Sequence, residues 1–390
     1  MTAPSYPSVV VSSYYGALDP NGVTPSTTAF QNAINDARSR WTQGWYTPTV
    51  NVPAGQYVVD ALDASSSTTV PGICFQGDGW NSTNICGILT GAYPIIDFTG
   101  VSRPAVKGMT IQTRGSNPGL ATCGVLFASN TQNAANFAPV IEDAIVSIGM
   151  GNAICGVAIG TADGAVLRDA TVNSYNAAGN AIGVSIGALP AGIVSKFQTI
   201  GAQSGNTYVN IHGSNITGNL PVDCSQTQAL TISGMTYVGA GNYGNLLHPA
   251  NCAIRVNASG GCFTLDANVR IENQANHTFT TFYPIYVAGN NGQPVQINVR
   301  GSSLNTGIVP NGAYVKVDNG RSDTALDLDF WFSSPQLPLF NVTGNLGRVS
   351  GKSTCTVDPI LTGTLGQFNH WSGHDFSAFV AAHGGKMGTS

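Results

Sequence analysis

Five six-residue segments of this chain share one pattern of apolar and polar positions. In each segment the first and last positions are apolar or aromatic, the second is polar and the third is Gly or Asp. The segments span residues 106–111, 141–146, 167–172, 211–216 and 232–237. The pattern predicts a strand, a one-residue corner and a second strand, because Gly and Asp tolerate the unusual dihedrals of a tight corner. The predicted corner residues are Gly108, Asp143, Asp169, Gly213 and Gly234.

The second and third segments also begin a longer repeat. They start at Ile141 and Leu167, and the downstream stretch 151–160 is echoed by 179–187. Short β-branched runs separated by Gly, Asn and Ser, repeating at an interval of roughly 26 to 28 residues, are typical of a β-solenoid whose turns stack on one another. The sequence therefore predicts an all-β solenoid as the main body of the chain.

The N-terminal part predicts how the solenoid begins. Thr24 and Pro25 provide a cap and a first-turn proline for a helix whose apolar face contains Phe30, Ala33, Ile34 and Ala37. Such a helix can cover the open end of a solenoid, which would otherwise expose its core and a strand edge. Residues 49–59 follow as two short strands around a Pro-Ala-Gly turn.

Residues 14 to 60 resemble the opening of the pectate-lyase-like superfamily. The resemblance rests on Tyr14-Tyr15-Gly16-Ala17, on 19–24, on the amphipathic helix and on Val50-Asn51-Val52-Pro53-Ala54-Gly55-Gln56-Tyr57. It implies a right-handed, single-stranded parallel β-helix with a short N-terminal capping helix. Many members are bacteriophage tailspikes or depolymerases, and such rods usually trimerise. The acidic Gly-Asp-Gly-x-x-Asp-Asp stretch common in the superfamily is replaced here by residues 20–26, which leaves activity open.

These observations divide the chain into three expected parts. Residues 1–60 would form the N-terminal cap and entry strands, 61–340 the parallel β-helix body, and 341–390 a C-terminal cap or oligomer contact.

Composition narrows the possible partners. Charged residues make up 9% of the chain and the formal net charge is -4, without basic clusters, which argues against nucleic acid. No apolar run approaches the ~20 residues that span a membrane, and the N-terminus lacks the basic and apolar regions of a signal peptide. We therefore expect a protein made in the host cytoplasm without a signal peptide and carried on a virion, at the phage tail or particle surface.

The eight cysteines are expected to be buried thiols. Cys123 and Cys155 occupy the same point of the repeat, as small apolar fillers of one interior stack would. No CxxC pair exists, which argues against a zinc site. Cys74 and Cys86 are the first pair to examine for a disulfide.

The first candidate site lies at 325–332. Strict alternation places Asp327, Asp329 and Trp331 on one face of a strand, opposite Leu326, Leu328 and Phe330. Residues i and i+2 of a strand lie about 6.5 Å apart, within the range of the two carboxyl groups of inverting glycosidases. An exposed Trp is a platform for a sugar ring. The alternative interpretation is a half-buried strand near the C-terminal end or trimer interface, with ordinary solvated aspartates.

The second candidate site comes from the six-residue segments. Stacking in register would place Glu142 over Arg168 and Asp143 over Asp169, each about one sheet spacing apart. Two aspartates at ~5 Å would share a proton or a ligand, and the pKa of one would rise, as general acid catalysis requires. The alternative is a corner ladder with a surface Glu-Arg pair.

The alternative chemistry for this second site is a lyase reaction. Arg168 would then neutralise a uronate carboxylate and His212 would act as base, with Lys107 as a further substrate-binding residue on the same outward positions.

A third cluster, His370, His374 and Asp375, has metal-ligand residue types. Trp371-Ser372-Gly373 between the histidines is a poor helix core, and the Glu of the hydrolase motif is missing. We expect neither a metal nor another cofactor.

Two functions remain open on sequence alone. One is a bacteriophage virion-associated tailspike-like protein that binds and cleaves a bacterial surface polysaccharide, as a hydrolase rather than a lyase. The other is a non-catalytic virion protein (fibre, adaptor or decoration protein) with the same fold. In both cases the expected partners are other virion proteins and two further copies of the chain.

Overall fold

The computed structural model describes residues 8–40, 47–68, 71–113, 120–131, 136–149, 151–176, 178–203, 206–225, 227–240, 252–257, 263–273, 281–288, 294–304, 311–332 and 337–388. The chain divides into two compact units. Unit 1 comprises residues 1–177 and 181–206, and unit 2 comprises 178–180 and 207–390.

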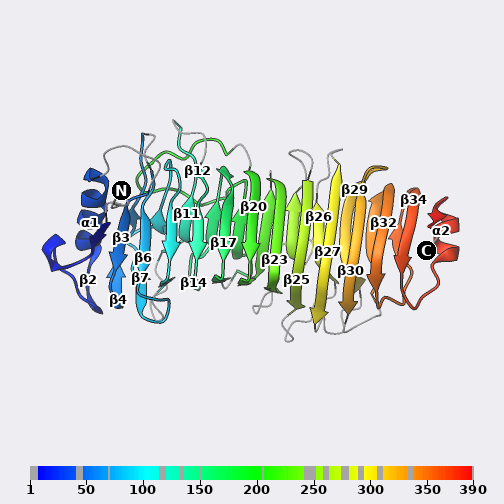
Figure 1. Cartoon of the computed structure of the whole chain (residues 1–390), viewed down its shortest axis with the longest axis horizontal. Helices are drawn as coiled ribbons and strands as arrows, with labels where there is room; N and C mark the ends of the chain where they lie inside the picture. The colour runs from blue at the N-terminus through cyan, green and yellow to red at the C-terminus, as the bar shows by residue number, and fades with distance from the viewer. Residues whose placement is uncertain are drawn as a thin grey trace, which may run out of the picture. The chain divides into compact units, whose positions relative to one another are not determined.

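The strands of unit 1 form three columns in which successive turns pair in parallel (Figure 1). The first column is β1 (Ser8–Val10), β3 (Thr49–Val52), β6 (Cys74–Gly77), β9 (Ala105–Lys107), β13 (Val140–Glu142) and β17 (Ala165–Arg168). The second is β2 (Asn21–Pro25), β4 (Gly55–Val59), β7 (Thr83–Gly87), β10 (Thr110–Thr113), β14 (Ile145–Gly149) and β18 (Thr171–Tyr175). The third is β5 (Leu62–Asp63), β8 (Pro94–Asp97), β11 (Cys123–Phe127), β15 (Cys155–Ile159) and β19 (Ile182–Ile186). A short pair, β12 (Asn136–Phe137) with β16 (Ala162–Asp163), lies outside these columns.

The corners between the first and second columns are those that the sequence predicts. Gly108, Asp143 and Asp169 have φ of 61°, 47° and 50°, in the left-handed region that only Gly, Asp and Asn adopt readily. At Gly108 a Cβ atom would also lie 2.9 Å from the carbonyl oxygen of Gly77 in the preceding turn. The corner therefore requires a residue without a side chain at this position.

The predicted register is confirmed as well. Ile141 pairs with Leu167, and Cys155 pairs with Ile182, in each case one repeat later. Cys123 pairs with Cys155, both are fully buried, and their Sγ atoms lie 3.5 Å apart. These two cysteines fill one interior stack, as expected.

All seven cysteines within the described residues are free thiols, and Cys262 lies outside that part of the chain. Cys74 is on β6 and Cys86 is on β7, and no bond joins them. The disulfide considered for this pair is thus not formed.

Helix α1 (Thr27–Ser39) covers the β1 end of unit 1 (Figure 1), and η1 (Ser13–Tyr15) precedes it. Its buried face is the predicted one, with Phe30 packed edge-on against Tyr57 at 5.4 Å between ring centroids. The predicted start of the helix is wrong by two positions. Thr24 and Pro25 belong to β2 and Ser26 is the cap residue, because β2 pairs with β4 up to Pro25 and keeps these residues extended.

Unit 2 has two columns of parallel strands (Figure 1). The first contains β20 (Asn206–His212), β21 (Asn215–Gly218), β23 (Thr227–Ala240), β25 (Phe263–Asn273), β27 (Val295–Leu304), β30 (Ala325–Phe332), β32 (Leu346–Ser353), β34 (Leu365–Trp371) and β35 (Lys386–Met387). The second contains β22 (Leu220–Ser225), β24 (Cys252–Asn257), β26 (Thr281–Ala288), β29 (Val315–Gly320), β31 (Phe340–Gly344) and β33 (Ile360–Leu361). A short strand, β28 (Asn311–Gly312), also pairs with β26, and helix α2 (Ser377–Ala382) follows β34.

The last two predicted corners differ from each other. Gly213 separates β20 from β21 and has φ of 56°. Gly234 has φ of 69° but lies inside the continuous strand β23, where the pairing with β25 shifts between Ile232 and Thr236. This corner is therefore a bulge, and from β25 onward the outward face is formed by longer strands.

Each unit is thus an all-β parallel β-helix, and unit 1 begins with a short capping helix. The fold implied by the resemblance to the pectate-lyase-like superfamily is confirmed at this level. Among the described helices none is long and apolar enough to cross a membrane.

Candidate functional site

Strand β30 of unit 2 presents its side chains alternately to the core and to the outside, as predicted. Leu326, Leu328 and Phe330 are at most 1% exposed. Asp327 and Asp329 are half-buried on the opposite face, and Trp331 is 69% exposed. The three residues of the first candidate site therefore share one outward face.

The neighbouring strands add a charged row and a polar row to this face. Asp329 pairs with Arg300 of β27 on one side and with Lys352 of β32 on the other, and Lys352 in turn pairs with Trp371 of β34. Asp327 lies one step earlier, between Asn298 and Ser350. Adjacent strands are ~4.8 Å apart, so each row brings its side chains within reach of one ligand.

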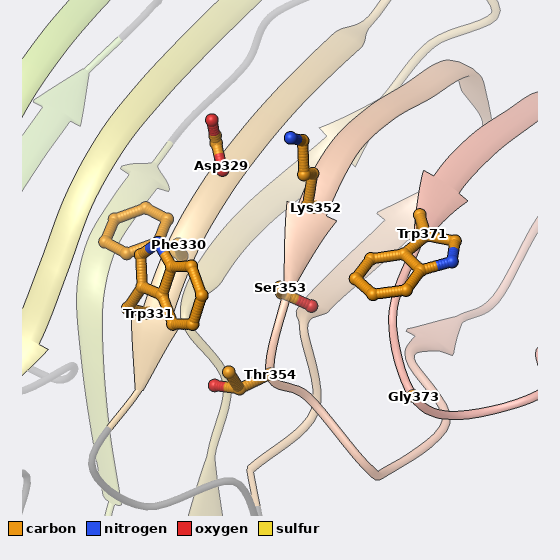
Figure 2. Close-up of a pocket in the computed structure, with 8 residues that line it drawn as sticks. All are labelled: Asp329, Phe330, Trp331, Lys352, Ser353, Thr354, Trp371 and Gly373. Atoms are coloured by element: carbon orange, nitrogen blue, oxygen red, sulfur yellow. The ribbon is translucent and has the colours of Figure 1, made fainter.

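A pocket of about 370 Å³ opens where β30, β32 and β34 end. It is lined by Asp329, Phe330, Trp331, Lys352, Ser353, Thr354, Trp371 and Gly373. Figure 2 shows the two indole rings on either side of Ser353 and Thr354, with Asp329 and Lys352 side by side toward one end. Trp371 is 71% exposed, so both indoles present large apolar faces to solvent.

The charged groups of this face form no ion pairs with one another. Most other acidic side chains of unit 2 are paired, for example Asp223 with Arg255 at 2.5 Å and Glu272 with Arg270 at 2.7 Å. Within the described part of the chain, neither Asp327 nor Asp329 has a cation within 4.0 Å, and Lys352 has no carboxylate partner. Their hydrogen-bonding capacity is available to a ligand.

This arrangement suits a carbohydrate. Sugar rings have apolar CH faces that stack on indoles and hydroxyl groups that bond to carboxylates, ammonium groups and amides. Two exposed tryptophans, with Asp329 and Lys352 at one end of the pocket, provide both kinds of contact. Asp327 does not line the pocket itself and lies beside it on the same strand face.

Sequence reasoning missed two of these residues, Lys352 and Trp371. The sequence from Leu365 to Trp371 has buried Leu365, Phe368 and His370, which would have indicated a strand with an exposed Trp at its end.

The second candidate site, in unit 1, is a row of ion pairs. Glu142 is half-buried between Lys107, at 2.9 Å, and Arg168. The pKa of Glu142 is held below its ordinary value, most of all by the hydrogen bond from Lys107 and also by the hydrogen bond from Arg168 and the positive charges of both residues. Partial burial acts in the opposite direction. A lowered pKa is the reverse of what a general acid needs, so the geometry supports the structural interpretation of this row.

The aspartates next to that row are corner residues. Asp143 and Asp169 both have left-handed backbone conformation, and the backbone N–H of Asp143 donates to the carbonyl oxygen of Arg168 at 3.0 Å. The corner explains both residues without catalysis, and a catalytic role for them stays a prediction. The same holds for substrate binding by Lys107 and Arg168, which are both already paired with Glu142.

His212, proposed as a lyase base, belongs to unit 2. It is exposed at the end of β20, and its Nδ1 lies 2.9 Å from Oγ of Ser233. No acidic or basic side chain is paired with it within the described residues.

The two C-terminal histidines do not share a ligand. His370 is buried on β34, whereas Nε2 of His374 lies 2.9 Å from the carboxylate of Asp358. No cluster of three metal-ligating side chains occurs in the described ranges.

Comparisons with known proteins give only remote likenesses. No family model and no curated protein matches the chain. A solved structure of ORF18 from Geobacillus virus E2 is 15% identical over 94% of this chain and 61% of its own, with a TM-score of 0.39. The present chain therefore spans less than two-thirds of that protein.

Two further structures have similar scores. The A-module of the mannuronan C-5 epimerase AlgE4 from Azotobacter vinelandii is 15% identical over 98% of this chain and 97% of its own, with a TM-score of 0.40. The catalytic unit of an α-1,3-glucanase from Streptomyces thermodiastaticus is 15% identical over 99% and 70%, with a TM-score of 0.37. Because all three TM-scores lie below 0.5, the activities in these names remain properties of those proteins.

Proposed function

We propose that this protein is a bacteriophage tailspike-like virion protein that binds a bacterial surface polysaccharide and cleaves it as a glycoside hydrolase. One observation supports this function above all others. The strand face with Asp327, Asp329 and Trp331 borders a pocket whose opposite wall is a second exposed tryptophan, Trp371.

Binding is the task of the tryptophans in this proposal. Trp331 and Trp371 lie two strands and two residues apart, which corresponds to about 12 Å between their Cα atoms from the sheet spacings. That separation leaves room for sugar units between the rings, over Ser353 and Thr354 of the pocket. Lys352 and Asp329 would bond to hydroxyl or acidic groups at the side.

Cleavage is the task of the aspartates. Asp327 and Asp329 are i and i+2 on one strand, so their backbones are about 6.6 Å apart. Inverting enzymes hold their two carboxyl groups far enough apart to leave space for a water molecule between one of them and the anomeric carbon, and this spacing is at the near end of that range. One carboxyl would protonate the leaving oxygen and the other would deprotonate the water.

The proposal includes an assembly and a location. We expect a homotrimer on the phage tail or particle surface, in contact with other virion proteins. The support is the charged fraction of only 9%, which suits packing of the flanks of β-helices, together with the resemblance of residues 14 to 60.

The test of cleavage is release of reducing ends from a panel of bacterial surface polysaccharides. Asp327→Asn and Asp329→Asn should each lower the rate by ~10²-fold or more and leave the Tm nearly unchanged, because both side chains face away from the core. Asp323→Asn is the matched control, since Asp323 lies in the turn before β30 and pairs with Arg321 outside the pocket.

Two other results would change the assignment. If both variants cleave as fast as the wild type, the site moves to Glu142, Asp143 and Asp169, where the same substitutions apply. If the wild type cleaves nothing and still joins a virion, the protein is the non-catalytic structural component.

A further inference from the structure

One residue that lines the pocket, Ser353, contacts a buried histidine, His370, and glycoside hydrolysis uses neither of them. His370 of β34 is 6% exposed and Ser353, the last residue of β32, is 7% exposed. Nε2 of His370 lies 2.8 Å from Oγ of Ser353. Ser353 also lines the pocket between Trp331 and Trp371 (Figure 2).

The surroundings of His370 determine its tautomer. Nδ1 lies 3.3 Å from the carbonyl oxygen of Ser350, and a carbonyl oxygen can only accept, so the proton is on Nδ1. Nε2 is then an acceptor, and the hydroxyl of Ser353 donates to it. The backbone N–H of Cys355, 3.3 Å from the same Oγ, helps to fix the hydroxyl in place.

The charge state of His370 suits a base. Burial lowers its pKa below the ordinary value, against the hydrogen bond to Ser350 and the charges of Asp327 and Asp329, which raise it. The imidazole is therefore neutral at pH 7 and can take a proton. Phe368 and Phe376 pack edge-on against the ring and hold its orientation.

These three parts have the geometry of an activated nucleophile: a hydroxyl in a ligand pocket, a neutral base within hydrogen-bond reach, and a group that orients the base. A second hydrogen bond between serine and histidine side chains among the described residues joins Ser233 to His212, and His212 is exposed. The pair of Ser353 and His370 differs from it because both side chains are buried and Ser353 lines a pocket.

We infer that Ser353 and His370 are the nucleophile and base of a second activity, the removal of ester-linked acyl groups such as O-acetyl from the sugar that the pocket binds. Oγ of Ser353 attacks the ester carbonyl carbon while its proton passes to Nε2 of His370. The bond from that carbon to the sugar oxygen breaks, and His370 returns the proton to the leaving sugar hydroxyl. Water then hydrolyses the acyl-serine by the same base, which releases a carboxylic acid and restores Ser353.

The pocket provides a group for the negative charge that develops on the carbonyl oxygen. Lys352, which lines the same pocket, brings an ammonium group.

The experiment uses the full chain with a fluorophosphonate probe and with p-nitrophenyl acetate. We expect peptide mapping to place the label on Ser353, and Ser353→Ala to abolish labelling and lower acetate hydrolysis by ~10²-fold or more. His370→Gln should lower both as well. The rate of hydrolysis should fall as the pH drops below the pKa of His370, and the pH profile should fit the titration of a single group.

The control is Ser174→Ala, which removes another buried serine hydroxyl, in unit 1, and should change neither readout. Should His370→Gln fail to fold, Ser353→Ala still decides, because it deletes a single oxygen. If Ser353 is not labelled, or if Ser353→Ala hydrolyses the acetate at the wild-type rate, Ser353 serves only as a hydrogen-bond partner for the buried His370. Neither reagent requires a polysaccharide, so a failure of the proposed glycan cleavage leaves this test unaffected.

Discussion

Asp97 shows how one buried carboxyl group in a parallel β-helix can make the free energy of unfolding depend on pH. It ends β8 in the third column of unit 1, is fully buried, and accepts a hydrogen bond from the backbone N–H of Thr99 at 2.9 Å. Burial raises its pKa to about 6, against hydrogen bonds from Ser195 and Thr99 that lower it. The folded state therefore binds this proton more tightly than the unfolded chain does.

We predict that Asp97 makes the protein less stable as the pH rises from about 4 to about 6. In that window the folded state retains the proton while the unfolded state, with a pKa of ~3.9, has lost it, so the free energy of unfolding falls. A shift of about two pKa units corresponds to ~3 kcal/mol. Asp97→Asn should raise the free energy of unfolding at pH 7.5 by up to that amount and change little at pH 4.

Urea unfolding at the two pH values measures this effect. Asp323→Asn, at an exposed turn, is the control and should leave the pH dependence as in the wild type. A wild-type pH dependence in Asp97→Asn as well would contradict the role assigned to Asp97.

At the scale of elements, the corners decide where one strand ends and the next begins. Asp169 separates β17 from β18 and has φ of 50°, a conformation that costs an ordinary L-residue ~1 kcal/mol or more and a β-branched one most of all. Asp169→Gly should therefore be close to neutral, and Asp169→Val should lower the free energy of unfolding by about 1–2 kcal/mol.

Thermal and urea unfolding measure this difference. Thr171→Val introduces the same side chain two positions later, in the extended backbone of β18, and should be harmless. Equal stability of Asp169→Gly and Asp169→Val would mean that the corner does not constrain the backbone.

The same local rules explain what the sequence could and could not predict. Alternation along β30 and four of the five Gly or Asp corners depend on neighbours close in the chain, and the sequence predicts them correctly. The fifth, Gly234, has the expected positive φ but lies inside β23 and not between two strands. The pocket depends on which turns lie side by side. Leu326 of β30 pairs with Val349 of β32, and Val349 pairs with Phe368 of β34.

The number of residues between paired positions is smaller in β30, β32 and β34 than in the middle of the chain, where Ile141 pairs with Leu167. That shortening places Lys352 and Trp371 beside Asp329, and no local pattern reveals it. The predicted start of α1 is wrong for a related reason: Thr24 and Pro25 have the residue types of a helix start, but the pairing of β2 with β4 keeps them in a strand.

At the scale of the whole molecule, the proposed virion role predicts a homotrimer. Sedimentation velocity at micromolar concentration should give a species of about 120 kDa, three times the chain mass of 40.2 kDa. A monomer or a dimer under these conditions would remove the trimer from the account.

Polysaccharide binding between the two tryptophans is the central claim of the whole account. Affinity electrophoresis in gels that contain the surface polysaccharide of a susceptible host tests it most directly. Trp331→Ala combined with Trp371→Ala should weaken binding by about 30-fold or more, since removal of buried aromatic contacts typically costs ~2 kcal/mol. Trp80→Ala, which removes a 42% exposed tryptophan of unit 1, should bind like the wild type. Unchanged affinity of the double variant, with the melting temperature intact, would contradict the account.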